Sequence, residues 1–543
     1  MRSMKFSGFC FASRMRAGRA AAALLAGALT AGGPSHAESL KEALTAAYLF
    51  NPTLKAAQAQ LRSTDNGVSL AKSGYRPTVS ATFQDGWDNL RSQLQSSAIP
   101  PGALPLCLGA GNPSTPGAPC NPNASLPLST LSTSQLGNGP SNPRIAQITA
   151  TETLFDGFRT YNNVKGAEAL VEAGREDLRS AEINVLLNAA TAYMNVVRDA
   201  AIVKLRQNNV RVLSEQLRAT QDRFKVGEVT RTDVAQAQSG LAQSQADLSI
   251  AQGTLYGDQA LFAQFIGHPP GTLRDPGPPT KLLPKTLQGA IDIAEAENPG
   301  ILGAIFRERA QQHQVKAVKG QLLPSLSVNA SQTWTNQPFG LPHVAFEEET
   351  RVYGQLTVPL YQAGSVSAQI RQAIETLSQA RQNTDAQREL ARSNVSSQWG
   401  LIVAARGNVA AGKSAVEATR IALQGVREEE KVGQRTILDV LNSEQQFLNA
   451  NVNLVSFQRD LVVAAYGVLA SEGRLTASDI ALQAELYDPT RYYGEVKDAW
   501  FGWGASVESR EDPRVAPVED PGRTPSQSSA DGPAYTQKLP QIP

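Results

Sequence analysis

The chain alternates between two hydrophobic patterns, and each pattern occurs twice. Residues 158–226 and 365–432 carry Ala, Leu, Gln, Glu, Arg and Val at helical spacing, without a proline. Each residue advances a helix by 1.5 Å, so each stretch predicts a helix about 100 Å long that must pack in a coiled coil or bundle. Lys-Val-Gly ends both stretches, and a second helical pattern then runs to about Gly267 or Gly473. The sequence therefore predicts two long helical hairpins.

Shorter stretches with a period of two residues flank these helices. Apolar and polar residues alternate over 79–87 and 326–334, and again over 146–154 and 352–360. They predict four strands of roughly ten residues with one apolar face, which is typical of a membrane β-barrel. An ordinary half-buried sheet has the same period and is the alternative.

The number of strands bears on the oligomeric state. Four strands cannot close a barrel, because the smallest membrane barrels have about eight, and an open edge in lipid leaves backbone groups unpaired. Strands that cross a membrane must therefore be shared among several copies of the chain. Trp87 and Trp334, which align with each other, suit the aromatic girdle at the membrane interface of such a barrel.

Both patterns belong to an internal duplication. Residues 39–83 align with 286–330 without a gap, and the two hairpin regions align in the same way, which means two equivalent structural units. The organisation that we expect is a signal peptide over 1–37, a first repeat over 38–284, a second repeat over 285–485, an equatorial segment over 486–507 and a disordered tail over 508–543. The first repeat includes a long loop over 88–143 and the hairpin 158–267, and the second includes the hairpin 365–473.

The first 37 residues are predicted to be a secretory signal. Five basic residues precede or flank a short apolar run over 20–29, and small residues stand at positions −3 and −1 of a cleavage point after Ala37. Cleavage removes five positive charges and no negative charge, so the net charge of +1 becomes −4. A mildly acidic chain without a basic stripe is a poor nucleic-acid binder. No later segment reaches the roughly 18–20 apolar residues of a transmembrane helix, which leaves a soluble periplasmic protein or one inserted as strands.

Cysteine usage agrees with export. Cys107 and Cys120 remain after cleavage and lie in one Pro/Gly/Asn-rich stretch, which makes them candidates for a disulfide that fixes a loop. Two free thiols are the alternative. No cysteine follows the cleavage point, so a lipid anchor there is not expected.

Signals for catalysis are weak. Residues 407–414 match the P-loop pattern letter for letter, but the match falls inside a helical pattern, whereas a P-loop needs a strand that delivers a glycine loop to a helix start. His268, His313 and His343 are scattered without metal-ligand spacing, and no Gly-x-Ser-x-Gly motif occurs. We expect no catalytic residue, metal, cofactor or nucleotide site.

The order of these elements resembles the TolC family of outer-membrane channels over about residues 38–502. Three kinds of motif carry the resemblance. Asn-Pro pairs occur at 51–52 and 298–299, and the segments LFDG and PLYQAG occur at 154–157 and 359–364. Turns of the form Val-Gly-x-x-Thr-x-x-Asp-Val occur at 226–234 and 432–440. The resemblance implies a mainly α-helical homotrimer with a twelve-stranded barrel in the outer membrane and a helical tunnel in the periplasm. It also implies tips that close the tunnel and meet an adaptor protein bound to an inner-membrane pump.

The resemblance places a gate at these tips. Arg435 matches the family's basic gate residue, and Asp233, next to Thr232, matches its acidic partner. Asp439 matches an acidic constriction ring, whereas the second acid of that ring falls on Asn442. A helix-capping role is the alternative for both aspartates.

The adaptor is expected to dock on the turns themselves, which are formed by Val226, Gly227, Val432 and Gly433. The tyrosine that the family carries near its gate is Glu430 in this chain. The segment from Tyr487 to Gly502 and the missing lipid-anchor cysteine resemble the type I secretion branch more than the lipidated drug-efflux members.

The function predicted is thus a passive exit duct for protein secretion or efflux. A periplasmic coiled-coil scaffold whose strands never enter a membrane is the second hypothesis. A third, an exported P-loop enzyme, would require Lys413 for function without a role in assembly.

Overall fold

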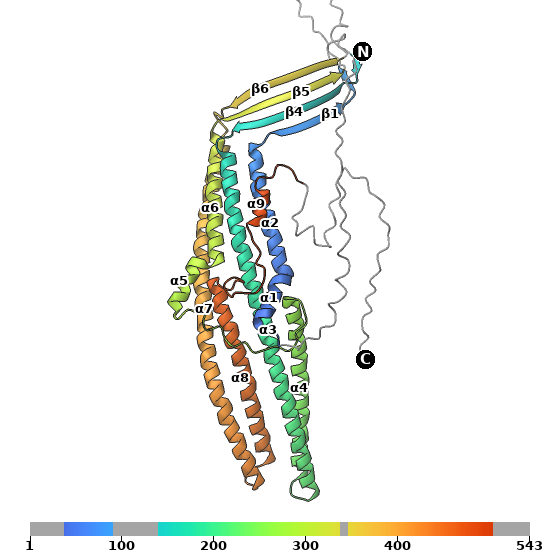
Figure 1. The fold of residues 1–543 in the computed structure, drawn as a ribbon, viewed down its shortest axis with the longest axis vertical. Coiled ribbons are helices and arrows are strands. Elements are labelled where there is room, and N and C mark those ends of the chain that lie inside the picture. The colour runs from blue at the N-terminus through green and yellow to red at the C-terminus, as the bar shows by residue number, and fades with distance from the viewer. Residues whose placement is uncertain (1–36, 91–138, 337–345, 503–543) are drawn as a thin grey trace, which may run out of the picture.

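The computed structural model describes residues 37–90, 139–336 and 346–502. Residues 1–36 of the predicted signal, the cysteines Cys107 and Cys120, and the end of the chain from residue 503 lie outside the described residues. The described chain is an elongated body with a sheet at one end and two helical tips at the other (Figure 1).

Two helical hairpins form most of its length. The first consists of α3 (Arg159–Lys225) and α4 (Arg231–Ile266), and the second of α7 (Ser365–Lys431) and α8 (Ile437–Glu472). The outgoing helices have 67 residues each and the returning helices have 36 each. The predicted long hairpins are confirmed, and the two repeats have helices of equal length.

Each repeat also has a pair of shorter helices joined at an Asn-Pro motif. These are α1 (Leu40–Phe50) with α2 (Pro52–Lys72), and α5 (Leu287–Glu297) with α6 (Pro299–Lys319). Asn51 accepts a hydrogen bond from the N–H of Thr53 at 2.9 Å, and its amide donates to the Phe265 carbonyl at 3.0 Å. Asn298 makes the equivalent bonds to Gly300 and to the Ser471 carbonyl. Each motif therefore caps one helix and ties it to the end of its repeat's hairpin.

Four antiparallel strands form the main sheet in the order β1-β4-β5-β6. Their bounds are Thr78–Asp85, Arg144–Phe155, Ser325–Asn336 and Phe346–Thr357. Two predicted strand ends are wrong. Trp87 lies beyond β1, and Leu360 lies beyond β6 in a segment that leads to α7. Within the loop predicted over 88–143, β2 (Asp88–Leu90) pairs with β3 (Gly139–Ser141).

The register places both tryptophans toward one end of the sheet. Asp85 pairs with Arg144, which pairs with Asn336, and Trp334 lies two positions before Asn336 on β5. Trp87 follows β1 at the same end and is 69% exposed. The two tryptophans therefore lie at a common level of the sheet, and the aromatic girdle at the membrane interface stays a prediction.

The strand-to-helix passages explain the LFDG and PLYQAG motifs. Asp156 accepts hydrogen bonds from the backbone N–H groups of Arg159 and Thr160 at 3.0 and 2.7 Å, which satisfies the start of α3. Gly157 has φ +71°, a conformation that costs other residues free energy, and Gly364 before α7 has φ +77°. Both glycines allow the chain to turn from the sheet into a long helix.

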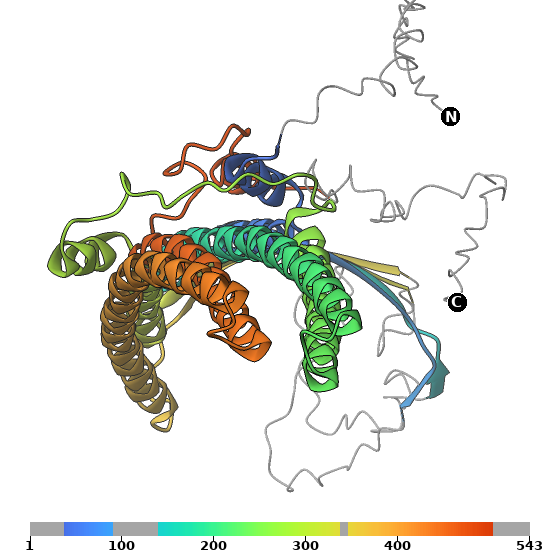
Figure 2. The same cartoon turned by 90° about the horizontal axis from the view of Figure 1, so that it is seen from below.

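The arrangement of helices is a curved wall. Below the level of α1 and α5, the order is α4, α3, α8, α7, and nearer the sheet it is α2, α3, α6, α7. Seen from the tips, the wall is an arc, with α1 and the C-terminal segment on its convex side (Figure 2).

The largest buried cluster lies where α1, α3, α4 and α8 meet, around Tyr193, Phe262, Leu186 and Leu469. Burial raises the pKa of Tyr193 to about 12.

The hydropathy of α8 corrects one expectation. Among the described helices, α8 is long and apolar enough by length and composition to cross a membrane, with a mean hydropathy of 1.2 over its most apolar window. We expected no such segment after the signal. In the fold α8 packs along α7 and α3, and 39% of that window is buried. Contacts with these two helices therefore account for the buried part of this apolar window.

Candidate functional site at the helical tips

The two tips have the same turn geometry. Gly227 has φ +82° and Gly433 has φ +77°, which are left-handed conformations. After each glycine, the next N–H donates to a carbonyl five residues earlier, so that Glu228 binds Arg223 and Gln434 binds Glu429. This is the Schellman arrangement that ends a helix, and it explains why Lys-Val-Gly closes both long helices.

Capping boxes begin the returning helices. The carboxylate of Asp233 accepts from the N–H and the hydroxyl of Thr230 at 2.8 and 2.7 Å. Asp439 accepts from Thr436 in the same way at 3.1 and 2.9 Å. These bonds, together with the nearby Arg435 charge, lower the pKa of Asp439 below its usual range. The capping role predicted for both aspartates is present in the single chain.

Arg435, the predicted basic gate residue, is bonded within its own turn. Its Nε donates to Glu429 Oε2 at 2.9 Å, and this bond raises its pKa. No hydrogen bond between Arg435 and Asp233 occurs among the described residues of one chain. Thr232 and Asn442 are exposed on the returning helices. Pairing of Arg435 with Asp233 thus stays a prediction for contacts between copies.

A link between the two hairpins was not predicted. Arg223 on α3 donates from Nη1 to Glu430 Oε1 on α7 at 2.5 Å. The Glu430 side chain is only 12% exposed and the Arg223 side chain 39%. The sequence marked Glu430 only as a departure from the family's tyrosine. No local signal could reveal its partner, because 207 residues separate the two.

A polar cavity lies above this link, between α3, α7 and α8. It has a volume of about 410 Å³ and is lined by Asn208, Asn209, Arg420, Arg427 and Glu444 among others. Arg427 and Glu444 form an ion pair that joins α7 to α8. In the first hairpin, Arg206 of α3 pairs with Asp247 of α4 at 2.8 Å, farther from the tip. Charged contacts therefore join the two helices of each hairpin, whereas the pair of Arg223 and Glu430 joins one hairpin to the other.

Comparison with known proteins identifies the chain. A family model described as outer membrane efflux protein matches residues 44–268 and 290–473, which together exceed half of the sequence. The chain belongs to the outer membrane efflux protein family. It is 36% identical to the outer membrane efflux protein BepC of Brucella suis over 89% of this chain and 96% of BepC. It is 24% identical to the outer membrane protein TolC of Escherichia coli over 64% of this chain and 73% of TolC.

Solved structures show the same fold. The structure of CusC, a protein that forms a transmembrane channel, matches with a TM-score of 0.63 at 16% identity, over 80% of this chain and 91% of CusC. The outer-membrane channel OprN matches with a TM-score of 0.62 at 18% identity, over 80% of this chain and 89% of OprN. The resemblance to the TolC family is confirmed. The chain is an outer-membrane efflux protein.

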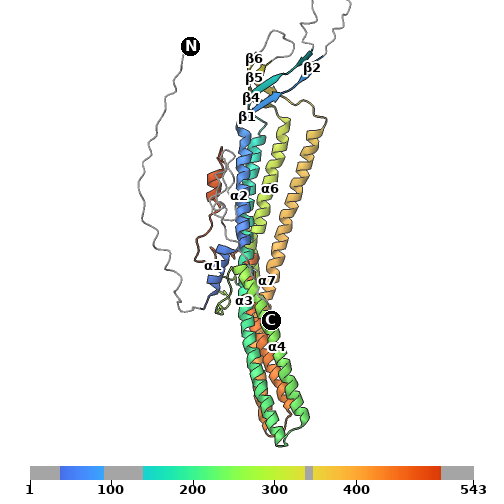
Figure 3. The same cartoon turned by 90° about the vertical axis from the view of Figure 1, so that its right-hand side faces the viewer.

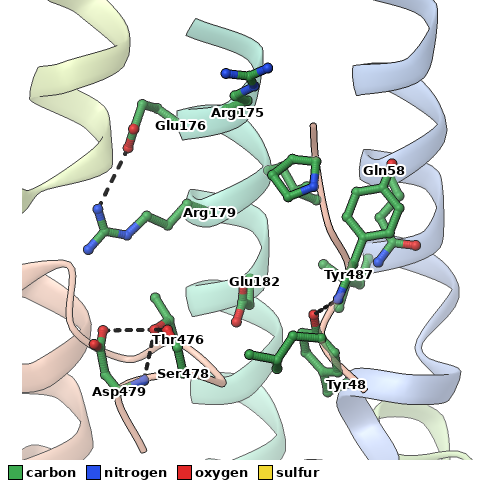
Figure 4. Close-up of a pocket in the computed structure, with 14 residues that line it drawn as sticks. Tyr48, Gln58, Arg175, Glu176, Arg179, Glu182, Thr476, Ser478, Asp479 and Tyr487 are labelled. Carbon is green, nitrogen blue, oxygen red and sulfur yellow. Dashed lines mark hydrogen bonds and ion pairs between the residues drawn. The ribbon is translucent and has the colours of Figure 1, made fainter. Parts of the chain in front are cut away.

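A second cavity in this efflux-family chain lies at the level of α1. It has a volume of about 330 Å³, and Figure 4 shows Arg179 and Glu182 of α3 facing Tyr48 and Tyr487 across it. Tyr487 N–H donates to the Tyr48 hydroxyl at 3.0 Å, and Glu182 accepts from the Ala477 N–H at 2.6 Å. Burial raises the pKa of Glu182. Each of these bonds fastens the C-terminal part of the chain to α1 or α3, so the cavity has a structural explanation.

The rejected motifs also have places in the fold. Residues 407–414, the P-loop match, are all helical and lie in the interior of α7, so no strand and no phosphate-binding loop accompany them. His268 lies 3.4 Å from Glu38 and His313 lies 3.3 Å from Asn162, far apart in the chain, while His343 lies outside the described residues. The described residues contain no group of three or more His, Cys, Asp or Glu that could hold a metal ion.

Substitution of a tip glycine tests the turn. Gly433→Val is expected to cost about 1–2 kcal/mol of local stability, because a β-branched residue at positive φ is strained. Nothing lies within 4 Å of a Cβ built at Gly433, so the effect comes from the backbone alone. Export activity and protease cleavage at the tip are the measurements. The control Gly425→Val has equal open space but lies inside α7, and full export by Gly433→Val would argue against a role for this turn.

Proposed function

We propose that three copies of this chain share one barrel and one tunnel. The observation that carries the proposal is the open sheet: β1 and β6 are its edges, and neither edge is paired within the described chain. Unpaired backbone groups are costly in lipid, and closing the sheet onto neighbouring copies satisfies them. Three copies of a four-stranded sheet give a barrel of twelve strands, with β6 of one copy beside β1 of the next.

The helical wall supports the same head-to-tail contact. Its two ends are α4 and α7, and both expose large apolar side chains, namely Ile250, Tyr256 and Leu261 on α4 and Ile374, Leu401, Val403 and Ile421 on α7. Different surfaces at the two ends, together with the curvature seen in Figure 2, suit an interface that closes into a ring. The tunnel then continues the barrel.

The tips are the proposed gate. In a ring, Arg435 of one copy can reach Asp233 of its neighbour, and Asp439 and Asn442 face the narrowed end. Val226 and Val432 are 73% and 71% exposed, which suits a docking surface for an adaptor bound to an inner-membrane pump. Adaptor contact would replace the tip contacts and let the hairpins move apart.

One measurement tests the assembly. The mature protein is extracted in detergent from purified outer membranes, and its mass is determined. A species of three chains is expected. A monomer recovered without detergent would instead support the scaffold hypothesis.

The gate is tested separately by the conductance of Asp233→Ala and Arg435→Ala in planar bilayers. Both are expected to conduct more than the native channel. Unchanged conductance in both would leave these residues with the capping and turn contacts alone.

A further inference from the structure

The C-terminal segment carries exposed aromatic side chains directly below the sheet. After α9 (Arg491–Val496) the chain runs along α2 and carries Trp500 and Phe501, which are 62% and 91% exposed. Large aromatic residues at such exposure need an explanation in terms of a partner.

Specific bonds hold this segment in place. Lys72 donates to Asp498 at 2.5 Å, and Ser69 and Arg76 donate to the Ala499 carbonyl at 3.2 and 2.6 Å. The Arg76 guanidinium also stacks on the Trp500 ring, 4.8 Å from its centroid. The ion pair with Lys72 lowers the pKa of Asp498, so the contact persists at neutral pH. The aromatic end is thus fixed to the end of α2.

Arg76, which contacts Trp500, shows where the aromatic residues lie relative to the barrel strands. Arg76 lies two residues before β1, which begins at Thr78 and is the first strand to enter the barrel. The segment lies on the convex side of the wall (Figure 2), and Figure 3 shows α9 on the outer side of α2, away from α6 and α7. Trp500 and Phe501 therefore lie outside the tunnel, at the level where the chain meets the periplasmic leaflet.

The second repeat provides an independent comparison. The internal alignment matches Tyr75 with Leu322 and Arg76 with Leu323. Leu322 and Leu323 are 52% and 44% exposed at the same helix-to-strand passage. The second repeat thus places two leucines at this level, whereas the first repeat has a cation there that carries an aromatic side chain from the C-terminal segment.

We propose that Trp500 and Phe501 are an interfacial anchor that inserts into the phospholipid headgroup region of the periplasmic leaflet. Aromatic rings favour this zone, and the cations Lys72, Arg76 and Lys497 lie beside them, which suits phosphate groups. The lipid that surrounds the strands is the occupant, because the patch is continuous with the membrane-spanning surface. The anchor clamps the C-terminal segment and α2 to the membrane.

Quenching by brominated lipid tests the proposal. Two full-length variants each keep one tryptophan, either Trp500 or Trp399 of α7, with the other tryptophans replaced by Phe. Both are reconstituted into vesicles of phosphatidylethanolamine and phosphatidylglycerol, with or without bromine at carbons 6 and 7 of the acyl chain. Trp500 emission is expected to fall at least twofold in brominated vesicles, while Trp399 emission stays unchanged. Equal emission of Trp500 in both vesicles overturns the proposal.

Two further measurements test the position of the aromatic residues, and the second applies if the tryptophan variants do not assemble. Addition of Arg76→Ala to the Trp500 variant should reduce the quenching, whereas Lys55→Ala, an exposed cation at the other end of α2, should not. If the tryptophan variants fail to form the species of native mass, a nitroxide at Phe501→Cys, with Cys107→Ser and Cys120→Ser, reports the same depth. Greater accessibility to oxygen than to a polar relaxation agent supports the anchor, and the reverse contradicts it.

Discussion

Replacing Arg223 with Ala is expected to raise the open probability of the assembled channel about tenfold. Its ion pair with Glu430 joins the two hairpins of one chain near the tips, and the proposed outward movement of one hairpin must break it. A hydrogen bond to a charged partner contributes about 1.5–3 kcal/mol. Since the Arg223 side chain is 39% exposed, we take the lower end of that range, and about 1.4 kcal/mol corresponds to a tenfold change in the equilibrium.

Single-channel recording in planar bilayers measures this effect. The control is Arg211→Ala, because Arg211 lies on the same helix and its side chain bonds locally to Asn208, three residues before it. The exchange Arg223→Glu with Glu430→Arg should restore the native open probability, since it rebuilds the pair with reversed charges. If the Arg223→Ala and Arg211→Ala channels have the same open probability, the ion pair of Arg223 and Glu430 does not hold the channel closed.

The sequence predicted those parts of the fold that local rules determine. The long helices follow from proline-free stretches of helix formers, and their ends follow from the left-handed glycines Gly227 and Gly433 and the capping threonines Thr230 and Thr436. The duplication made each of these predictions twice, so the two copies supported each other. The four strands of the main sheet were also predictable, because the alternation is a property of each strand alone.

Contacts between segments far apart in the chain could not be predicted from the sequence. Nothing near Arg223 or Glu430 indicates that their helices meet, and the docking of residues 486–502 on α2 depends on bonds across more than 420 positions, such as that from Lys72 to Asp498. The apolar face of α8 was underestimated for the same reason, since its partners are α7 and α3. Strand ends failed because ladder pairing, rather than composition, decides where β1 and β6 stop.

A second large effect is expected at Glu472, the last residue of α8. Its side chain has no solvent exposure, and neither carboxylate oxygen has a hydrogen-bond partner. The nearby cations are engaged elsewhere: Arg474 donates to Glu297 twice at 2.7 Å, and Arg179 donates to the Gly473 carbonyl at 2.9 Å. Burial therefore raises the pKa of Glu472 from 4.5 to about 7.

The sign of the pH dependence follows from proton binding. Between pH 4.5 and about 7 the folded chain holds a proton on Glu472 that the unfolded chain has released, so the free energy of unfolding falls as the pH rises through this window. Above it, the buried charge costs roughly 3 kcal/mol, because each unit between 4.5 and about 7 is worth about 1.36 kcal/mol. Glu472→Gln removes the charge while keeping the shape, so it should raise the melting temperature at pH 8 and leave it nearly unchanged at pH 5.

Thermal unfolding of the detergent-solubilised protein at the two pH values measures the difference. The control is Glu417→Gln on α7, where an exposed carboxylate pairs with Arg420 and its pKa is lowered. That variant should gain no stability at pH 8, because it loses a favourable contact instead of a buried charge. If Glu472→Gln and Glu417→Gln behave alike at both pH values, Glu472 is already neutralised or hydrated when ionised, and the end of α8 must open to water in the assembled channel.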